Sequence, residues 1–108
     1  MDELNSKKEE ILSEIHSLGY DSLRYSVFTN DRLKEWEVRI EFNPDTEEYE
    51  VYSTMDRASV IGKYQFSDYN EAKEMFFTIL DIVVTSNRRS VERGEHPEYP
   101  SPLWGSKP

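Results

Sequence analysis

The sequence contains no cysteine among its 108 residues, which excludes a disulfide framework and thiol chemistry. It also lacks any stretch approaching about 18 apolar residues, and its first residues show no basic segment followed by an apolar run. We therefore expect neither a membrane-spanning helix nor a secretion signal. Because a cysteine-free chain suits a reducing compartment, we expect a cytoplasmic protein.

Motifs that carry catalysis are missing as well. There is no Gly-rich phosphate loop, no nucleophile elbow and no His-Glu-x-x-His pattern. The two histidines, His16 and His96, lie far apart in the sequence and belong to no cluster of metal-ligating residues. We expect no catalytic residue, no metal and no cofactor, and hence no enzyme.

The sequence has fewer basic residues than acidic ones. Thirteen lysines and arginines oppose 22 aspartates and glutamates, which gives a net charge of −9. This sign argues against nucleic acid or an anionic membrane as a partner, and it suits a basic protein. Residues 33–58 hold three basic and eight acidic side chains, so 3 − 8 = −5 of the net charge lies in this quarter of the chain.

Residues 35–52 carry the clearest structural pattern. Apolar and charged residues alternate on either side of a turn at 43–46, which is typical of a β-hairpin with one buried face. The face predicted to enter the core carries Trp36, Val38, Ile40, Phe42, Tyr49 and Val51. The opposite face carries Glu35, Glu37, Arg39, Glu41, Glu48 and Glu50, and we expect it to face water.

Helical and strand patterns surround this hairpin. Apolar spacing and glycine stops predict helices over 5–18 and from 67 or 68 to 94, and alternation predicts further strands over 23–28 and 59–66. Short connections favour an antiparallel meander. We predict a single α+β domain over residues 1–94, in the order α-β-β-β-β-α. Its four-stranded antiparallel sheet should have the N-terminal and C-terminal helices packed on one face.

The second predicted helix is longer than the sheet. About 26 helical residues span about 39 Å, whereas strands of about seven residues span about 23 Å. Its last turns should therefore overhang the sheet or bend away from it.

The final segment, residues 95–108, holds four of the five prolines together with Tyr99, Leu103 and Trp104. Proline-rich tails are often disordered, but disordered tails are poor in such apolar and aromatic residues. We expect the tail to dock on the domain as far as about residue 104 and to fray beyond it.

The charged face of the hairpin has two interpretations. Antiparallel sheets commonly leave one polar face in water, which alone would explain the glutamates. Glutamate is however a poor strand former, and Phe28, Tyr52 and Ile61 are expected beside these charges, as anchors are in interfaces. The docked tail is a competing cover for the same aromatic groups. Asp56 and Arg57, in the connector after the hairpin, either pair internally or reach a partner.

Five segments together resemble a small family of bacterial immunity proteins, which accompany the toxic C-terminal domains of polymorphic or contact-dependent toxins. They are SLRYSVF (22–28), NDR (30–32), KEWEVRIEF (34–42), TMDRASVIG (54–62) and YPSPLW (99–104), and the likeness covers about residues 10–104. The resemblance implies a non-enzymatic inhibitor that binds a cognate toxin. Many such toxins are basic nucleases, which agrees with the net charge.

We therefore predict toxin neutralisation by one-to-one binding through the acidic sheet face. The partner-binding residues expected from this hypothesis are Phe28, Glu35, Glu37, Arg39, Glu41, Glu48, Glu50, Tyr52, Asp56 and Arg57. Two alternatives are an adaptor or regulatory domain of an unrelated pathway that uses the same face, and a small-molecule binder with a pocket between helices and sheet. A homodimer through the open face or an edge strand would hide the proposed surface.

Overall fold

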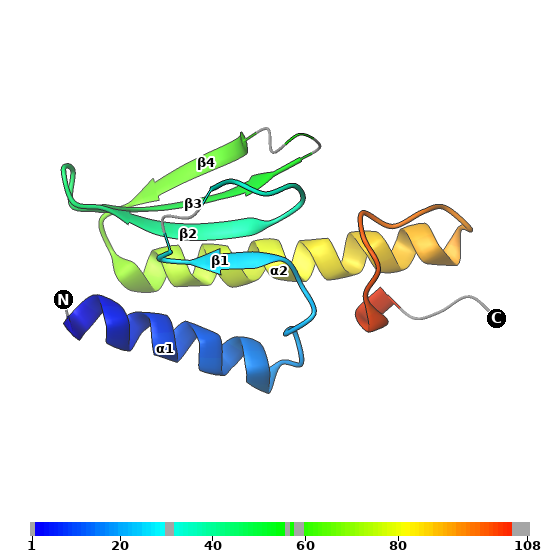
Figure 1. Cartoon of the computed structure of the whole chain (residues 1–108), viewed down its shortest axis with the longest axis horizontal. Coiled ribbons are helices and arrows are strands. Elements are labelled where there is room, and N and C mark those ends of the chain that lie inside the picture. Colours follow the sequence, from blue (N-terminus) through cyan, green and yellow to red (C-terminus); the bar gives the residue numbers. More distant parts are fainter. Residues whose placement is uncertain (1, 30–31, 56, 58–59, 105–108) are drawn as a thin grey trace.

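The computed structural model describes residues 2–29, 32–55, 57 and 60–104. Two long helices flank four strands, which confirms the predicted α+β class and element order (Figure 1). The elements are α1 (Asp2–Ser17), β1 (Tyr25–Val27), β2 (Val38–Asn43), β3 (Glu48–Thr54), β4 (Val60–Phe66), α2 (Tyr69–Glu92) and the 3-10 helix η2 (Pro102–Trp104). Within the described residues, no helix is both long and apolar enough to cross a membrane.

The strands form one mixed sheet in the order β1-β2-β3-β4. β2 and β4 each pair antiparallel with β3, but β1 runs parallel to β2, with Tyr25 opposite Val38 and Val27 opposite Ile40. The prediction of a purely antiparallel meander is therefore wrong at its first pair. The short connection expected after β1 would pair the two strands antiparallel, whereas the actual connection carries the chain back to the end of the sheet where β1 began.

Gly62 shifts the register of the last strand. Val51 pairs with Tyr64, but Thr54 pairs with Val60, one residue out of step. The φ of Gly62 is 57°, a left-handed conformation that glycine adopts readily and that is typical of a β-bulge. Because of this bulge, Val60 and Tyr64 lie on opposite faces, whereas simple alternation predicted the same face for both.

Both helices contact the face of the sheet that carries Tyr49. Lys7 of α1 donates a hydrogen bond to the Tyr49 hydroxyl at 2.8 Å, and Tyr69 of α2 packs its ring 5.8 Å from that of Tyr49. The helices also pair with each other, since Lys73 lies 2.5 Å from Glu14. The core between these layers holds Ile11, Ile15, Val27, Val38, Ile40, Val51, Ala72, Phe76, Leu80 and Val84.

Both ends of α2 and the C-terminal end of α1 follow the sequence signals, whereas α1 begins at Asp2, before the predicted start at residue 5. Asp68 caps α2 by accepting a hydrogen bond from the Glu71 amide, and the spacing of these two residues is that of a capping box. Gly19 and Gly94 take left-handed conformations just beyond the two helices, with φ of 74° and 80°. Leu18 is an exception to the predicted apolar stripe of α1, because half of it is exposed.

The C-terminal half of α2 extends past the sheet, and the tail returns along it (Figure 1). Tyr99 and Trp104 are buried, and their rings pack edge to face at 5.5 Å. The Tyr99 hydroxyl accepts a hydrogen bond from the Arg24 amide at 3.0 Å, and Arg88 of α2 donates to the Leu103 carbonyl at 2.8 Å. The tail therefore supplies apolar cover for the part of α2 that the sheet does not reach.

Truncation of Trp104 tests how much this packing stabilises the domain. The Trp104→Ala variant removes a buried indole and should lower the free energy of unfolding by about 3–5 kcal/mol. Pro100→Ala, at an exposed position of the same tail, should change it by less than about 0.5 kcal/mol. Urea unfolding followed by circular dichroism measures the free energy of unfolding of both variants. Equal stability of the two variants would show that the packing of Trp104 does not stabilise the domain.

Candidate functional site

The strand register gathers charged and aromatic side chains on the face of the sheet that points away from the helices. Val38, Ile40 and Val51 face the core, so the residues between them along β2 and β3 face outward. Arg39 lies opposite Tyr52, and Glu41 lies opposite Glu50. We call the surface formed by Arg39, Glu41, Glu50, Tyr52 and Lys63 the outer sheet face.

Arg39 is the centre of this face. Only 1% of its side chain is exposed, and it donates hydrogen bonds to Glu37 on one side and to Glu41 on the other, the latter at 2.6 and 2.9 Å. Burial by itself would lower the pKa of Arg39, but the hydrogen bonds to Glu37 and Glu41 raise it overall. The guanidinium therefore remains a buried cation between two carboxylates.

The connection between β1 and β2 closes over one end of this cluster. Arg39 donates to the Arg32 carbonyl at 3.4 Å, and the Lys34 amide donates to the Glu37 carboxylate at 3.3 Å. Thr54 joins the connection to β3, because its hydroxyl donates to the Lys34 carbonyl and accepts from the Glu37 amide. The prediction that Glu37 and Arg39 face water is therefore wrong, since residues 32–37 cover them.

Tyr52 forms a hydrogen bond with the second carboxylate oxygen of Glu41. Its hydroxyl donates to Glu41 Oε1 at 2.9 Å. Burial, followed by this hydrogen bond and the charge of Glu41, raises the pKa of Tyr52 to about 12. The phenol is therefore protonated at neutral pH, and Glu41 is fixed by Tyr52 and Arg39 together.

Glu50 is held from the neighbouring strand. Lys63 lies 3.6 Å from one oxygen of Glu50 and 4.9 Å from the centre of the Tyr52 ring, and Gln65 donates to the other oxygen at 3.3 Å. Glu41 and Glu50 keep 16% and 13% of their side chains exposed. Both carboxylates thus have partners within the sheet and are still reachable from solvent.

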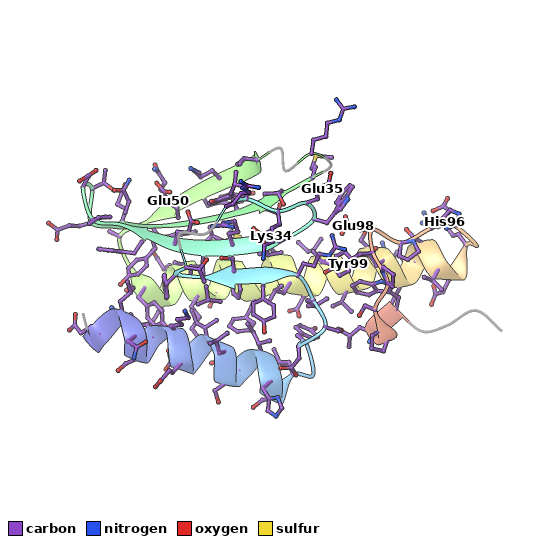
Figure 2. The ribbon with its side chains drawn as sticks, in the orientation of Figure 1. Lys34, Glu35, Glu50, His96, Glu98 and Tyr99 are labelled. Atoms are coloured by element: carbon purple, nitrogen blue, oxygen red, sulfur yellow. The ribbon has the colours of Figure 1, made fainter. Side chains whose placement is uncertain are left out.

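The turn of the hairpin continues the acidic surface. Asp45, Glu47 and Glu48 carry exposed or half-buried carboxylates at this end of the sheet. The Asp45 amide donates to the Asn43 side chain at 2.9 Å, which fixes the turn, and Glu47 takes a left-handed φ of 55°. Figure 2 shows Glu50 toward this end and Glu35 toward the opposite one.

Glu35 belongs to a separate site at the far end of the sheet. Its carboxylate accepts a hydrogen bond from the Arg57 amide at 2.6 Å, and its carbonyl accepts one from Arg24 at 3.3 Å. The Arg57 side chain is exposed. Asp56, which was predicted beside it, lies outside the described residues.

Phe28 does not lie beside Tyr52, as alternation along a longer first strand predicted. Its ring packs 6.2 Å from that of Tyr49, on the helix-covered face. The cause is local: β1 ends at Val27, and Phe28 takes a left-handed φ of 52° that breaks the alternation. Phe28 is therefore separated from the other predicted partner-binding residues.

Sequence reasoning missed three polar residues of this region, Lys34, Thr54 and Lys63. Lys63 could have been found, because a glycine inside a strand pattern signals a bulge, and a bulge at Gly62 changes the face of the residues next to it. Lys34 contributes its backbone carbonyl, and the Thr54 hydroxyl bonds to backbone groups of the irregular connection before β2. No periodic pattern in the sequence predicts such contacts.

The chemistry of this face is that of a binding surface. In residues 2–29, 32–55, 57 and 60–104, no three histidine or carboxylate side chains gather where a metal could be held. Within the same ranges every buried side-chain nitrogen and oxygen has a hydrogen-bond partner. What the face offers to a partner is the partly exposed carboxylates of Glu41 and Glu50, because Arg39 and Tyr52 are buried beneath them.

The buried cation can be tested by truncation. Arg39→Ala leaves Glu37 without a counterion in a nearly dry site, so the free energy of unfolding should fall by about 3–5 kcal/mol. Arg57→Ala removes an exposed arginine as a matched control and should cost less than about 0.5 kcal/mol. Chemical denaturation of both variants provides the comparison, and similar losses would show that the Arg39 charge is not structurally required.

The raised pKa of Tyr52 predicts how stability depends on alkaline pH. Its folded pKa of about 12 exceeds the ordinary value of about 10, so its contribution is complete below about pH 10 and is lost as the pH rises toward 12. The stability difference between the wild type and Tyr52→Phe should therefore narrow by about 2 kcal/mol across this window. Urea unfolding at several pH values tests this, with Tyr64→Phe, at an exposed position, as the control. If the stability difference between the wild type and Tyr52→Phe stays constant across these pH values, the hydrogen bond from Tyr52 to Glu41 is contradicted.

Comparison with known proteins places the chain in a functional class. A family model described as Immunity protein 59 matches residues 4–105, nearly the whole chain. No curated protein and no solved structure matches it. Immunity proteins are in general non-enzymatic, and their role is to neutralise a toxin. The resemblance inferred from the sequence is confirmed: the chain belongs to the Immunity protein 59 family, which indicates a toxin-neutralising role and a protein toxin as partner.

Proposed function

We propose that this protein neutralises its cognate toxin domain by binding it through the outer sheet face and the adjoining acidic turn. The observation that carries the proposal is the pairing of Glu41 with Glu50 across β2 and β3. Like charges directly opposite each other in a sheet are destabilising. Each of these carboxylates has its own partners, Arg39 and Tyr52 for Glu41 and Lys63 for Glu50.

The charge of the surface supports a basic partner. Five units of the net negative charge fall within residues 33–58, and the carboxylates of the turn, which are part of this count, have no described cation beside them. Such a surface attracts a positively charged protein over a distance and raises its association rate. A nuclease domain presents basic groups to nucleic acid, so we propose a basic nuclease as the toxin and its nucleic-acid surface as the target.

The predicted residues take different parts in this proposal. Glu41, Glu48 and Glu50 contact the toxin directly, whereas Glu37 and Arg39 are buried and hold Glu41 in place. Tyr52 is buried as well, and its hydroxyl orients Glu41. Glu35 and Arg57 form a second contact region at the opposite end of the sheet. Phe28 packs on the other face and does not belong to this surface.

Genetics tests the immunity role itself. Deleting the gene should be lethal when the adjacent upstream gene, the expected source of the toxin, remains in place, and the double deletion should restore growth. A viable single deletion would count against immunity and would favour an adaptor role in another pathway. Affinity capture from the native cell then separates the two classes, because an immunity protein should retain one dominant, toxic partner.

Charge reversal tests the proposed surface. Reversing Glu47 and Glu48 to lysine should slow association with the purified upstream gene product by about tenfold at low salt, and the difference should shrink as salt screens the charges. Reversing Glu3 and Glu9 on α1 changes the net charge equally and serves as the control. Surface plasmon resonance gives both rates. Equal slowing by the two pairs would assign the effect to overall charge and not to the hairpin.

A further inference from the structure

The surface of α2 that points away from the core carries a large apolar residue, Ile82, at its centre. Ala72, Phe76, Leu80 and Val84 are buried on the inner side of the helix, and Ile82 lies on the opposite side. Ile82 is 59% exposed, more than any other large hydrophobic residue among those described. A side chain of this size, placed in the middle of a long helix, has no cover within the described chain.

Small side chains surround Ile82. A shallow depression of about 510 Å³ runs along this part of the helix, and only α2 and its C-cap line it. Its lining residues are Thr78, Asp81, Ile82, Thr85, Ser86, Arg89, Ser90 and Arg93. Short side chains next to a protruding isoleucine provide the ridge and groove that helix packing requires.

Two charged residues, Glu71 and Arg93, lie at equal distances on either side of Ile82 and have opposite signs. Glu71 precedes Ile82 by 82 − 71 = 11 residues, and Arg93 follows it by 93 − 82 = 11 residues. Eleven residues make about three helical turns, so both side chains lie on the same side of the helix as Ile82. Both are exposed.

A second copy of the chain fits this arrangement. If two α2 helices cross antiparallel about a twofold axis at Ile82, each Glu71 meets the Arg93 of the other copy, and each Thr78 meets a Ser86. An interface between identical copies must be self-complementary in this way. We infer that the protein forms a twofold-symmetric homodimer through the outward face of α2.

The same charges also complement the helix dipole, since Glu71 lies in the first turn and Arg93 at the C-cap. That effect accounts for their signs. It does not account for an exposed isoleucine midway between them, which an antiparallel pair of helices buries. The dimer leaves the outer sheet face of each copy free, so this inference is independent of the proposed toxin contact.

Sedimentation velocity over a dilution series of the full chain tests the dimer. Ile82→Asp places a carboxylate at the centre of the contact in both copies and should raise the dimer dissociation constant by about 100-fold or more. Val60→Asp makes the same change at an exposed apolar position of the β4 edge and should leave the constant unchanged. A monomer at every concentration, or a dimer lost in Val60→Asp and kept in Ile82→Asp, would overturn the inference.

A charge exchange separates pairing between copies from the helix dipole. Arg93→Glu should raise the dissociation constant by roughly tenfold, because each Glu71 would then face a glutamate at position 93 of the other copy. Adding Glu71→Lys to the same chain restores opposite charges across the dimer and should bring the constant back to near the wild-type value. The dipole alone predicts the reverse, since the double variant is unfavourable at both helix ends. A double variant that dimerises no better than Arg93→Glu would rule out the contact.

Discussion

The outer half of this fold depends on a buried cation, Arg39. Arg39 enters the sheet at a position where alternation alone would expose it, and residues 32–37 fold over it. A buried charge without a partner is strongly destabilising, and Glu37 and Glu41 supply two partners from the same strand region. The Arg39 guanidinium thereby links the irregular connection to the ends of β2 and β3 and to Glu41.

This linkage explains how a surface rich in carboxylates can be ordered. Glu41 and Glu50 repel each other across the strand pair, but each has positively charged or hydrogen-bonding neighbours. A carboxylate fixed before binding loses less side-chain entropy when a partner arrives. In the account proposed above, the interior charges of the cluster orient the face, and the more exposed charges of the turn guide the approach of a basic protein.

The regular parts of the fold were predictable from sequence, and the irregular parts were not. Val38, Ile40 and Val51 reach the core as their alternation predicts, and Asp68 and Gly94 bound α2 as capping signals predict. The errors occur where the backbone leaves regular structure. Phe28 and Gly62 take left-handed conformations, and each changes the face on which its neighbours lie.

The candidate site was only partly predictable for the same reason. The carboxylates of β2 and β3 were found because they follow the strand period, and their placement together is a consequence of the hairpin register. The burial of Arg39 was missed because it depends on a connection of irregular conformation, whose backbone carbonyls and amides have no signature in the sequence. Long-range packing, and not local pattern, decides which charges of this face are covered.

Hydrogen–deuterium exchange of the protein, with and without the purified product of its upstream gene, tests the central proposal most directly. The account predicts slower exchange in the turn at residues 43–48 and in the adjoining ends of β2 and β3 when the toxin is bound, with little change in α1. Protection confined to the helices, with an unchanged hairpin turn in a complex that forms and neutralises the toxin, would contradict it.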